Sequence, residues 1–248
     1  MNRPEGPLEL LGRIPHASNA TFLAECEGVR LVYKPIRGER PLWDFPGVVL
    51  AEREVAAHVV SAALGFDVVP PTWLREGPHG PGMVQYWVDP VELDPAPVDL
   101  VPRGQEPDGF AAVVEGIDGQ DRPVTLVHEL SEPLRRMALF DVVVNNADRK
   151  GGHVLAADDT ARQGIDHGIA FHHEPKLRTV LWGWAGQPVP EDDLARVEKL
   201  AQDPPAELEE LIGVAEHRAF VERCRALVRT GVMPLPGGDW PAVPWPPF

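Results

Sequence analysis

The chain has 248 residues, of which 44% are hydrophobic and 25% charged, a composition typical of a globular protein with one large or two small cores. Its 38 acidic and 23 basic residues give a formal net charge of −15. A surface this acidic repels phosphate backbones and anionic headgroups, which argues against a non-specific nucleic-acid binder and a polybasic membrane clamp.

The cysteine count and the hydropathy pattern indicate a compartment. Cys26 and Cys224 are the only cysteines, too few for a disulfide framework, so a reducing environment is expected. No window approaches 18 uninterrupted apolar residues, and the first residues lack the apolar region of a signal peptide. We therefore expect a soluble, cytoplasmic protein without stable membrane insertion.

Residues 1–88 predict a small lobe with an antiparallel sheet and one helix. Their alternating and β-branched segments predict strands over 9–14, 21–26, 29–34, 72–75 and 82–88. Between the third and fourth of these, apolar residues recur every three to four positions over 49–64, and Gly65 follows as a stop signal. This spacing predicts an amphipathic helix.

Residues 89–108 carry five prolines and several acids, which predicts an irregular connector between two lobes. Beyond it, a helix is expected over 131–144, with Ser131 as the N-cap and Pro133 in the first turn. Further helices are expected near 191–202, 205–213 and 215–229. The fold class is therefore α+β, with residues 109–230 forming a mostly helical second lobe.

Residues 231–248 form a tail with six prolines, which excludes a helix or a central strand. Two interpretations remain open. The tail either packs as an extended strap against the C-terminal helices or serves as a proline-rich ligand for a protein partner.

The usual Gly-rich nucleotide motifs are absent, but a lysine, a glutamate and two aspartates stand in an order that suits phosphoryl transfer. Lys34 ends a predicted strand, from which its ammonium can reach phosphates. Glu54 in the next helix, favoured over Glu52, can hold that lysine. Asp148 follows an apolar helix and can orient an acceptor hydroxyl, while Asp166, in a loop with Gly168, can carry metal ions.

These residues lie in segments that resemble a known superfamily. Val32-Tyr33-Lys34-Pro35, Asn146-Ala147-Asp148-Arg149 and Ile165-Asp166-His167-Gly168-Ile169-Ala170-Phe171 are similar to motifs of the phosphatidylinositol 3-/4-kinases, nearest the type II 4-kinases. The HipA-like atypical kinases share the same layout. The resemblance covers about residues 14–172 and suggests a bacterial branch of the superfamily with a two-lobed, atypical protein-kinase-like fold.

The resemblance implies an ATP-dependent phosphotransferase that transfers the γ-phosphate to a hydroxyl of an unidentified acceptor. Asp148 would be the catalytic aspartate, Asp166 a metal ligand and Lys34 a phosphate ligand, with Glu54 beside it. The turn over 16–21 would bind phosphate through the backbone of small residues. The further ATP-binding residues expected are Ser18 and Asn19 in that turn and, along the adenine, Gln85, Trp87 and Val88.

His153 departs from the superfamily, which has an asparagine metal ligand five residues after the catalytic aspartate. His153 either ligates the metal or hydrogen-bonds its own loop. Imidazole suits Mn²⁺ better than Mg²⁺, so as a ligand it predicts a preference for Mn²⁺. The expected cofactors are ATP and Mg²⁺ or Mn²⁺.

Three alternatives use the same residues. One is a HipA-like protein Ser/Thr kinase, and another is a nucleotidyl transferase that binds the nucleotide in the opposite direction. The third is a catalytically inactive nucleotide-binding pseudokinase scaffold, which the substitution at His153 suggests. The joint presence of Lys34, Asp148 and Asp166 favours an active enzyme over the third.

Overall fold

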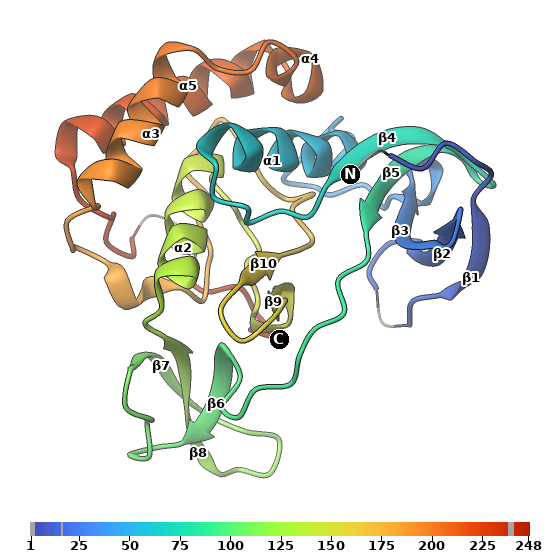
Figure 1. The fold of residues 1–248 in the computed structure, drawn as a ribbon. Coiled ribbons are helices and arrows are strands. Elements are labelled where there is room, and N and C mark those ends of the chain that lie inside the picture. The colour runs from blue at the N-terminus through green and yellow to red at the C-terminus, as the bar shows by residue number, and fades with distance from the viewer. Residues whose placement is uncertain (1–2, 16, 238–240) are drawn as a thin grey trace.

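The computed structural model describes residues 3–15, 17–237 and 241–248. Figure 1 shows a lobe built around a sheet, a mostly helical lobe, and a smaller sheet that projects from the helical lobe. The predicted α+β class, with a small antiparallel-sheet N-lobe and a mostly helical C-lobe, is confirmed.

The N-lobe sheet is antiparallel, with its strands in the order β1 (Glu9–Arg13), β2 (Phe22–Cys26), β3 (Val29–Pro35), β5 (Gly80–Tyr86) and β4 (Thr72–Gly77). Alternate residues of a strand point to opposite faces. Leu31 and Tyr33 of β3 are buried in the core on one face of the sheet. Lys34 therefore points to the opposite face.

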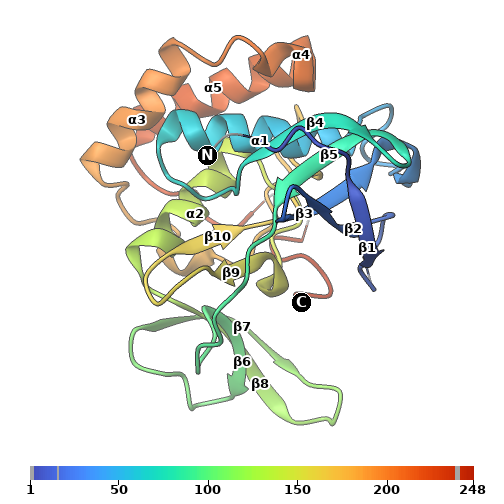
Figure 2. The same cartoon turned by 45° about the vertical axis from the view of Figure 1, so that its right-hand side comes forward.

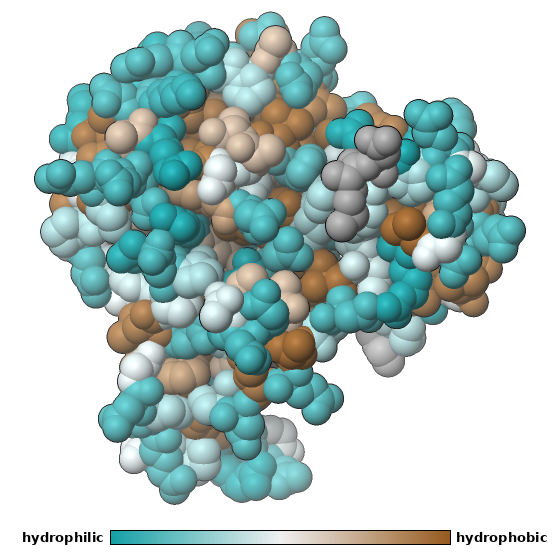
Figure 3. All heavy atoms as spheres, viewed as in Figure 1, coloured by the Kyte–Doolittle hydropathy of each residue, from teal (hydrophilic) through white to brown (hydrophobic). Residues whose placement is uncertain are grey.

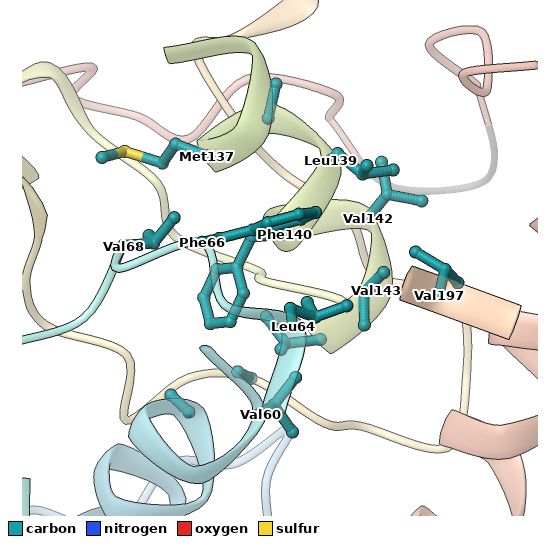
Figure 4. Packing of buried hydrophobic residues seen from close by; sticks show 14 of the residues in the cluster. Val60, Leu64, Phe66, Val68, Met137, Leu139, Phe140, Val142, Val143 and Val197 are labelled. Atoms are coloured by element: carbon teal, nitrogen blue, oxygen red, sulfur yellow. The ribbon is translucent and has the colours of Figure 1, made fainter. Parts of the chain in front are cut away.

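Helix α1 (Leu50–Leu64) joins the two lobes. It follows β3 in the N-lobe, but Val60 and Leu64 belong to the core of the C-lobe. Figure 4 shows them packed with Phe140 and Val143 of helix α2 (Glu132–Val144). The second half of α1 is thus anchored in the C-lobe core.

The C-lobe contains the expected helices. Ser131 caps α2, since its hydroxyl accepts a hydrogen bond from the Leu134 N–H at 3.3 Å. The other helices are α3 (Glu191–Gln202), α4 (Leu208–Ile212), which is shorter than predicted, and α5 (Val214–Thr230). The C-lobe also contains a short hairpin of β9 (Val154–Ala156) and β10 (Arg162–Gly164). The two lobes further contain the 3₁₀ turns η1 (Ile36–Gly38), η2 (Gly151–His153) and η3 (Trp182–Trp184).

The prediction that residues 89–108 are irregular is wrong for Val98–Pro102 alone. Strand β6 (Val98–Pro102) pairs with β8 (Pro123–Glu129), which also pairs with β7 (Phe110–Ile117). The prolines are tolerated because Pro102 and Pro123 stand at strand ends, where a missing N–H costs least. Figures 1 and 2 show this sheet projecting below the C-lobe.

The described part of the tail is an extended strap, as one of the two interpretations predicted. Its Ala242 carbonyl accepts hydrogen bonds from Thr179 N–H at 3.0 Å and from the Trp182 indole at 2.9 Å. Gly151 N–H donates to the Pro247 carbonyl at 2.8 Å. These bonds lead to loops around η2 and η3 rather than along the C-terminal helices. A protein partner for the tail stays a prediction.

Hydrophilic residues cover most of the face in Figure 3, in keeping with the charge of the sequence. The projecting sheet also carries exposed apolar residues, Leu100, Val114 and Ile117. Among the residues that the structure describes, no helix is long and apolar enough to cross a membrane.

Candidate active site

Lys34 lies between two carboxylates that come from distant parts of the chain. Its Nζ is 2.5 Å from Oε1 of Glu54 on α1 and 2.8 Å from Oδ1 of Asp166 in the C-lobe. Glu54 is therefore the partner of Lys34, as predicted. Glu52 instead lines a separate groove beside Trp73.

Lys34 and Asp166 stabilise each other's charges. Burial alone would lower the pKa of Lys34, but Asp166 and Glu54 outweigh it and raise that pKa above its ordinary value. The Lys34 ammonium in turn holds the pKa of Asp166 well below its usual range. Burial raises the pKa of Glu54, whose second oxygen accepts a hydrogen bond from His167 N–H at 2.9 Å. Lys34 is thus a fixed cation at the junction of the lobes.

Asp166 occupies a backbone conformation that few non-glycine residues adopt, with φ of +62°. Its side chain is 53% exposed even though one oxygen is held by Lys34. Strained residues of this kind persist where the surrounding structure over-determines them, and they cluster at functional sites. Oδ2 of Asp166 faces Nε2 of His153, in the loop that carries Asp148, at 3.6 Å.

That loop begins where α2 ends, at Asn145 in the left-handed conformation with φ of +54°. Asn146 holds the next turn, because its Oδ1 accepts a hydrogen bond from Asp148 N–H at 3.0 Å. The Asp148 carboxylate lies 3.4 Å from Lys150 Nζ, and burial raises its pKa. Lys150 was not singled out from the sequence, although its position two residues after Asp148 places it beside that carboxylate.

Arg149 braces the site from inside the protein, with no exposed side-chain surface. Its Nη2 and Nε donate to the Asp141 carboxylate of α2 at 2.8 and 3.1 Å. Its Nη1 donates to the backbone carbonyls of His153 and Ile165, both at 3.3 Å. One buried guanidinium therefore connects α2 with the two loops that carry Asp148 and Asp166.

His153 hydrogen-bonds its own loop, which is one of its two predicted roles. Its other role, as a metal ligand, stays a prediction. Its Nδ1 lies 3.0 Å from the Asp148 carbonyl oxygen, which can only accept, so Nδ1 carries the proton. Burial lowers the pKa of His153 to about 4, so the ring is neutral. The Nε2 lone pair then faces Oδ2 of Asp166 at 3.6 Å. Two acceptors with no proton between them suit a cation.

A metal ion at this place would need ligands from elsewhere as well. Within the described ranges, no group of three or more His, Cys, Asp or Glu side chains is arranged to hold a metal. Asp166 and His153 offer two donors, so phosphate oxygens and water would complete the coordination, which is the usual arrangement for Mg²⁺ in phosphoryl-transfer sites.

These residues surround a cavity of about 170 Å³. The predicted residues that line it are Ser18, Asn19, Lys34, Glu54, Asp148 and Asp166. The cavity is smaller than the ~300–1,000 Å³ of a pocket for a drug-sized ligand, so it has room for only part of such a molecule. Residue 16 of the predicted phosphate-binding turn lies outside the described residues.

The residues assigned to adenine do not line this cavity. Gln85 pairs with Val32 and so shares a sheet face with Lys34, but its amide donates to the Thr72 hydroxyl at 2.8 Å. The Trp87 indole donates to Asp89 at 2.9 Å. The roles of Gln85, Trp87 and Val88 stay predictions.

The segment between β3 and α1 also belongs to the site, although the sequence motifs did not predict it. Glu39, Arg40 and Leu42 line the cavity, and the Glu39 carboxylate accepts hydrogen bonds from Leu50 and Ala51 N–H at 2.9 and 2.8 Å. Glu39 thereby caps α1. The sequence carries one indication of this cap. Val49, the residue before α1, has no side-chain acceptor, so the group that caps α1 has to come from another segment.

Comparison with known proteins identifies a bacterial relative. Protein Rv2133c of Mycobacterium tuberculosis is 48% identical over 260 aligned positions, covering 98% of this chain and 93% of the relative. The chain belongs to the Rv2133c family. No protein-family model matches it. Among solved structures, the Helicobacter pylori proinflammatory kinase CtkA is similar with a TM-score of 0.47 and 10% identity, covering 92% of this member of the Rv2133c family and 97% of CtkA.

Proposed function

We propose that this protein is an ATP-dependent phosphotransferase that transfers the γ-phosphate to a hydroxyl acceptor. The observation that carries the proposal is the convergence of Lys34, Glu54, Asp148 and Asp166, from four separate segments, on one cavity at the junction of the lobes. Phosphoryl transfer asks a protein mainly to position groups and to neutralise charge, and these are the residue types that it uses.

Each residue has a role that its contacts support. Lys34, held by two carboxylates, binds phosphate oxygens, while the small turn with Ser18 and Asn19 offers backbone N–H groups to them. Asp166 and His153 hold the metal ion, which supplies neutralisation of the phosphate charge when bound. Asp148 orients the acceptor hydroxyl and takes its proton, for which a pKa raised by burial is favourable.

We place the protein in the phosphatidylinositol 3-/4-kinase-like superfamily, with the HipA-like kinases as the alternative branch. The placement is supported by the lysine on β3, its glutamate on α1 and the two aspartates in C-lobe loops. Cys26 and Cys224 are buried and unpaired. This supports a reducing compartment, and we place the activity in the cytoplasm.

The direct test uses ATP labelled on the γ- or the α-phosphate, incubated with the purified protein and Mn²⁺ or Mg²⁺. We expect label to be released or transferred only from the γ-position. Transfer of the α-label would show a nucleotidyl transferase instead. Tight nucleotide binding with no release of either label would show an inactive nucleotide sensor and would overturn the proposal.

The metal preference should depend on His153. The wild type is expected to bind the nucleotide more tightly with Mn²⁺ than with Mg²⁺, and His153→Asn should shift the ratio of the two affinities towards Mg²⁺ by at least ~tenfold. Titration calorimetry with each metal measures both ratios. His173→Asn, an exposed histidine on another loop, is the matched control. Equal affinities for the two metals in the wild type would contradict the role of His153.

A further inference from the structure

The strap returns to the loop that carries Asp148 and His153. Its Pro247 carbonyl accepts the hydrogen bond of Gly151 N–H at 2.8 Å, at the first residue of η2. His153 is the last residue of that single turn. Figures 1 and 2 both show the end of the strap, marked C, close to β9, which directly follows η2.

Phe248 fills the space that a side chain at position 151 would need. A Cβ built on Gly151 would lie 2.2 Å from Cε1 of the Phe248 ring and 2.7 Å from its Cδ1 and Cζ. Real Cβ atoms do not approach other atoms so closely, so the ring lies directly against the Gly151 backbone. The ring can occupy this position only because residue 151 has no side chain.

The turn needs such support, because its own bonds are few. Gly151 and Gly152 are adjacent, and glycine loses more conformational freedom on folding than any other residue. Within the turn, His153 N–H donates to the Lys150 carbonyl at 3.1 Å, in the weaker geometry of a 3₁₀ turn. Contacts from outside the turn therefore decide how well it is held.

The strap is itself anchored to the framework of the site. Thr179 N–H donates to the Ala242 carbonyl at 3.0 Å, and the Thr179 hydroxyl donates to Asp141 at 3.0 Å. Asp141 is the carboxylate that binds Arg149. The segment from Ala242 to Phe248 thus connects the buried Asp141–Arg149 pair with the outer side of the turn over 151–153.

We propose that Phe248 is a positioning residue of the active site, which holds the turn over 151–153 and thereby aims the His153 imidazole at Asp166. The consequence for metal binding rests on the proposed function, whereas the hold on the turn does not. Trp245 in the same strap is 85% exposed and serves as a control that removes an aromatic ring without removing the contact.

The first experiment measures the hold on the turn without any nucleotide. Hydrogen exchange followed by mass spectrometry should show amides of the 149–155 segment exchanging at least ~tenfold faster in Phe248→Ala than in the wild type, because local opening becomes easier. Gly151→Ala, which displaces the ring, should have the same effect, and Trp245→Ala should have none. Unchanged exchange in Phe248→Ala would overturn the proposal.

The second experiment measures the effect on the site. Phe248→Ala should weaken binding of Mn²⁺–ATP by at least ~tenfold, whereas ATP binding in EDTA, which depends on Lys34, should stay the same. Phe248→Tyr should restore the metal-dependent affinity. Faster exchange without any loss of that affinity would assign the strap a purely structural role and overturn the positioning role. If the wild type binds no nucleotide, the proposed function fails, while the exchange experiment still decides whether Phe248 holds the turn.

Discussion

Asp148→Asn is expected to lower the rate of γ-phosphate release by roughly 10²–10⁴-fold, the usual contribution of a positioned general base. Asparagine keeps the shape of the side chain but cannot take a proton. Since Asp148 pairs with Lys150, whereas Lys34 is held by Glu54 and Asp166, the affinity for Mn²⁺–ATP should change little. Release of labelled phosphate at saturating nucleotide measures the rate, and calorimetry measures the affinity.

Asp159→Asn provides the control, because Asp159 is an exposed aspartate in the loop between β9 and β10. It should leave both quantities unchanged. If Asp148→Asn retains the wild-type rate, another group takes the proton and the assignment of Asp148 is wrong.

Asp141→Ala is expected to lower the free energy of unfolding by about 3–5 kcal/mol, the usual cost of removing one partner of a buried ion pair. Asp141 and Arg149 have no exposed side-chain surface. Without Asp141, the Arg149 charge stays buried, and the Asn146 amide and the Thr179 hydroxyl lose the carboxylate to which they donate. Urea denaturation followed by circular dichroism measures the loss.

Two further variants test whether the loss of stability comes from the buried ion pair. Glu132→Ala removes an exposed acid from the same helix, which pairs with Arg136, and should cost at most ~1 kcal/mol. The double variant Asp141→Leu with Arg149→Met removes both charges and should be more stable than Asp141→Ala. A double variant that is less stable than the single one would show that the pair is not the source of the effect.

The sequence was most informative where a local pattern and the tertiary structure agree. The three- to four-residue period over 49–64 predicted α1, and Ser131 predicted the start of α2. The spacing of the motifs also brought out Lys34, Asp148 and Asp166, which the structure places around one cavity. Lys34 lies at the end of a strand, Asp148 follows the end of a helix, and Asp166 lies in a loop with a glycine. Each of these places can be recognised from the local sequence.

The sequence was least informative where pairing depends on distant residues. Prolines obscured β6, because a single sequence does not show that Pro102 stands at a strand end beside β8. The Glu39 cap on α1 comes from a different segment of the chain. The fit of Phe248 against Gly151 joins two segments that nothing in the local pattern connects. All three are consequences of tertiary packing rather than of propensity.

Nucleotide binding by this cavity is tested by calorimetric titration of the wild-type protein and of Asp166→Ala with ATP in the presence of Mn²⁺. We expect one nucleotide per wild-type chain and at least ~tenfold weaker binding to Asp166→Ala, because Asp166 accepts a hydrogen bond from Lys34 at 2.8 Å and is the proposed metal ligand. Absence of binding to the wild type, or equal affinity for the two proteins, would contradict this expectation.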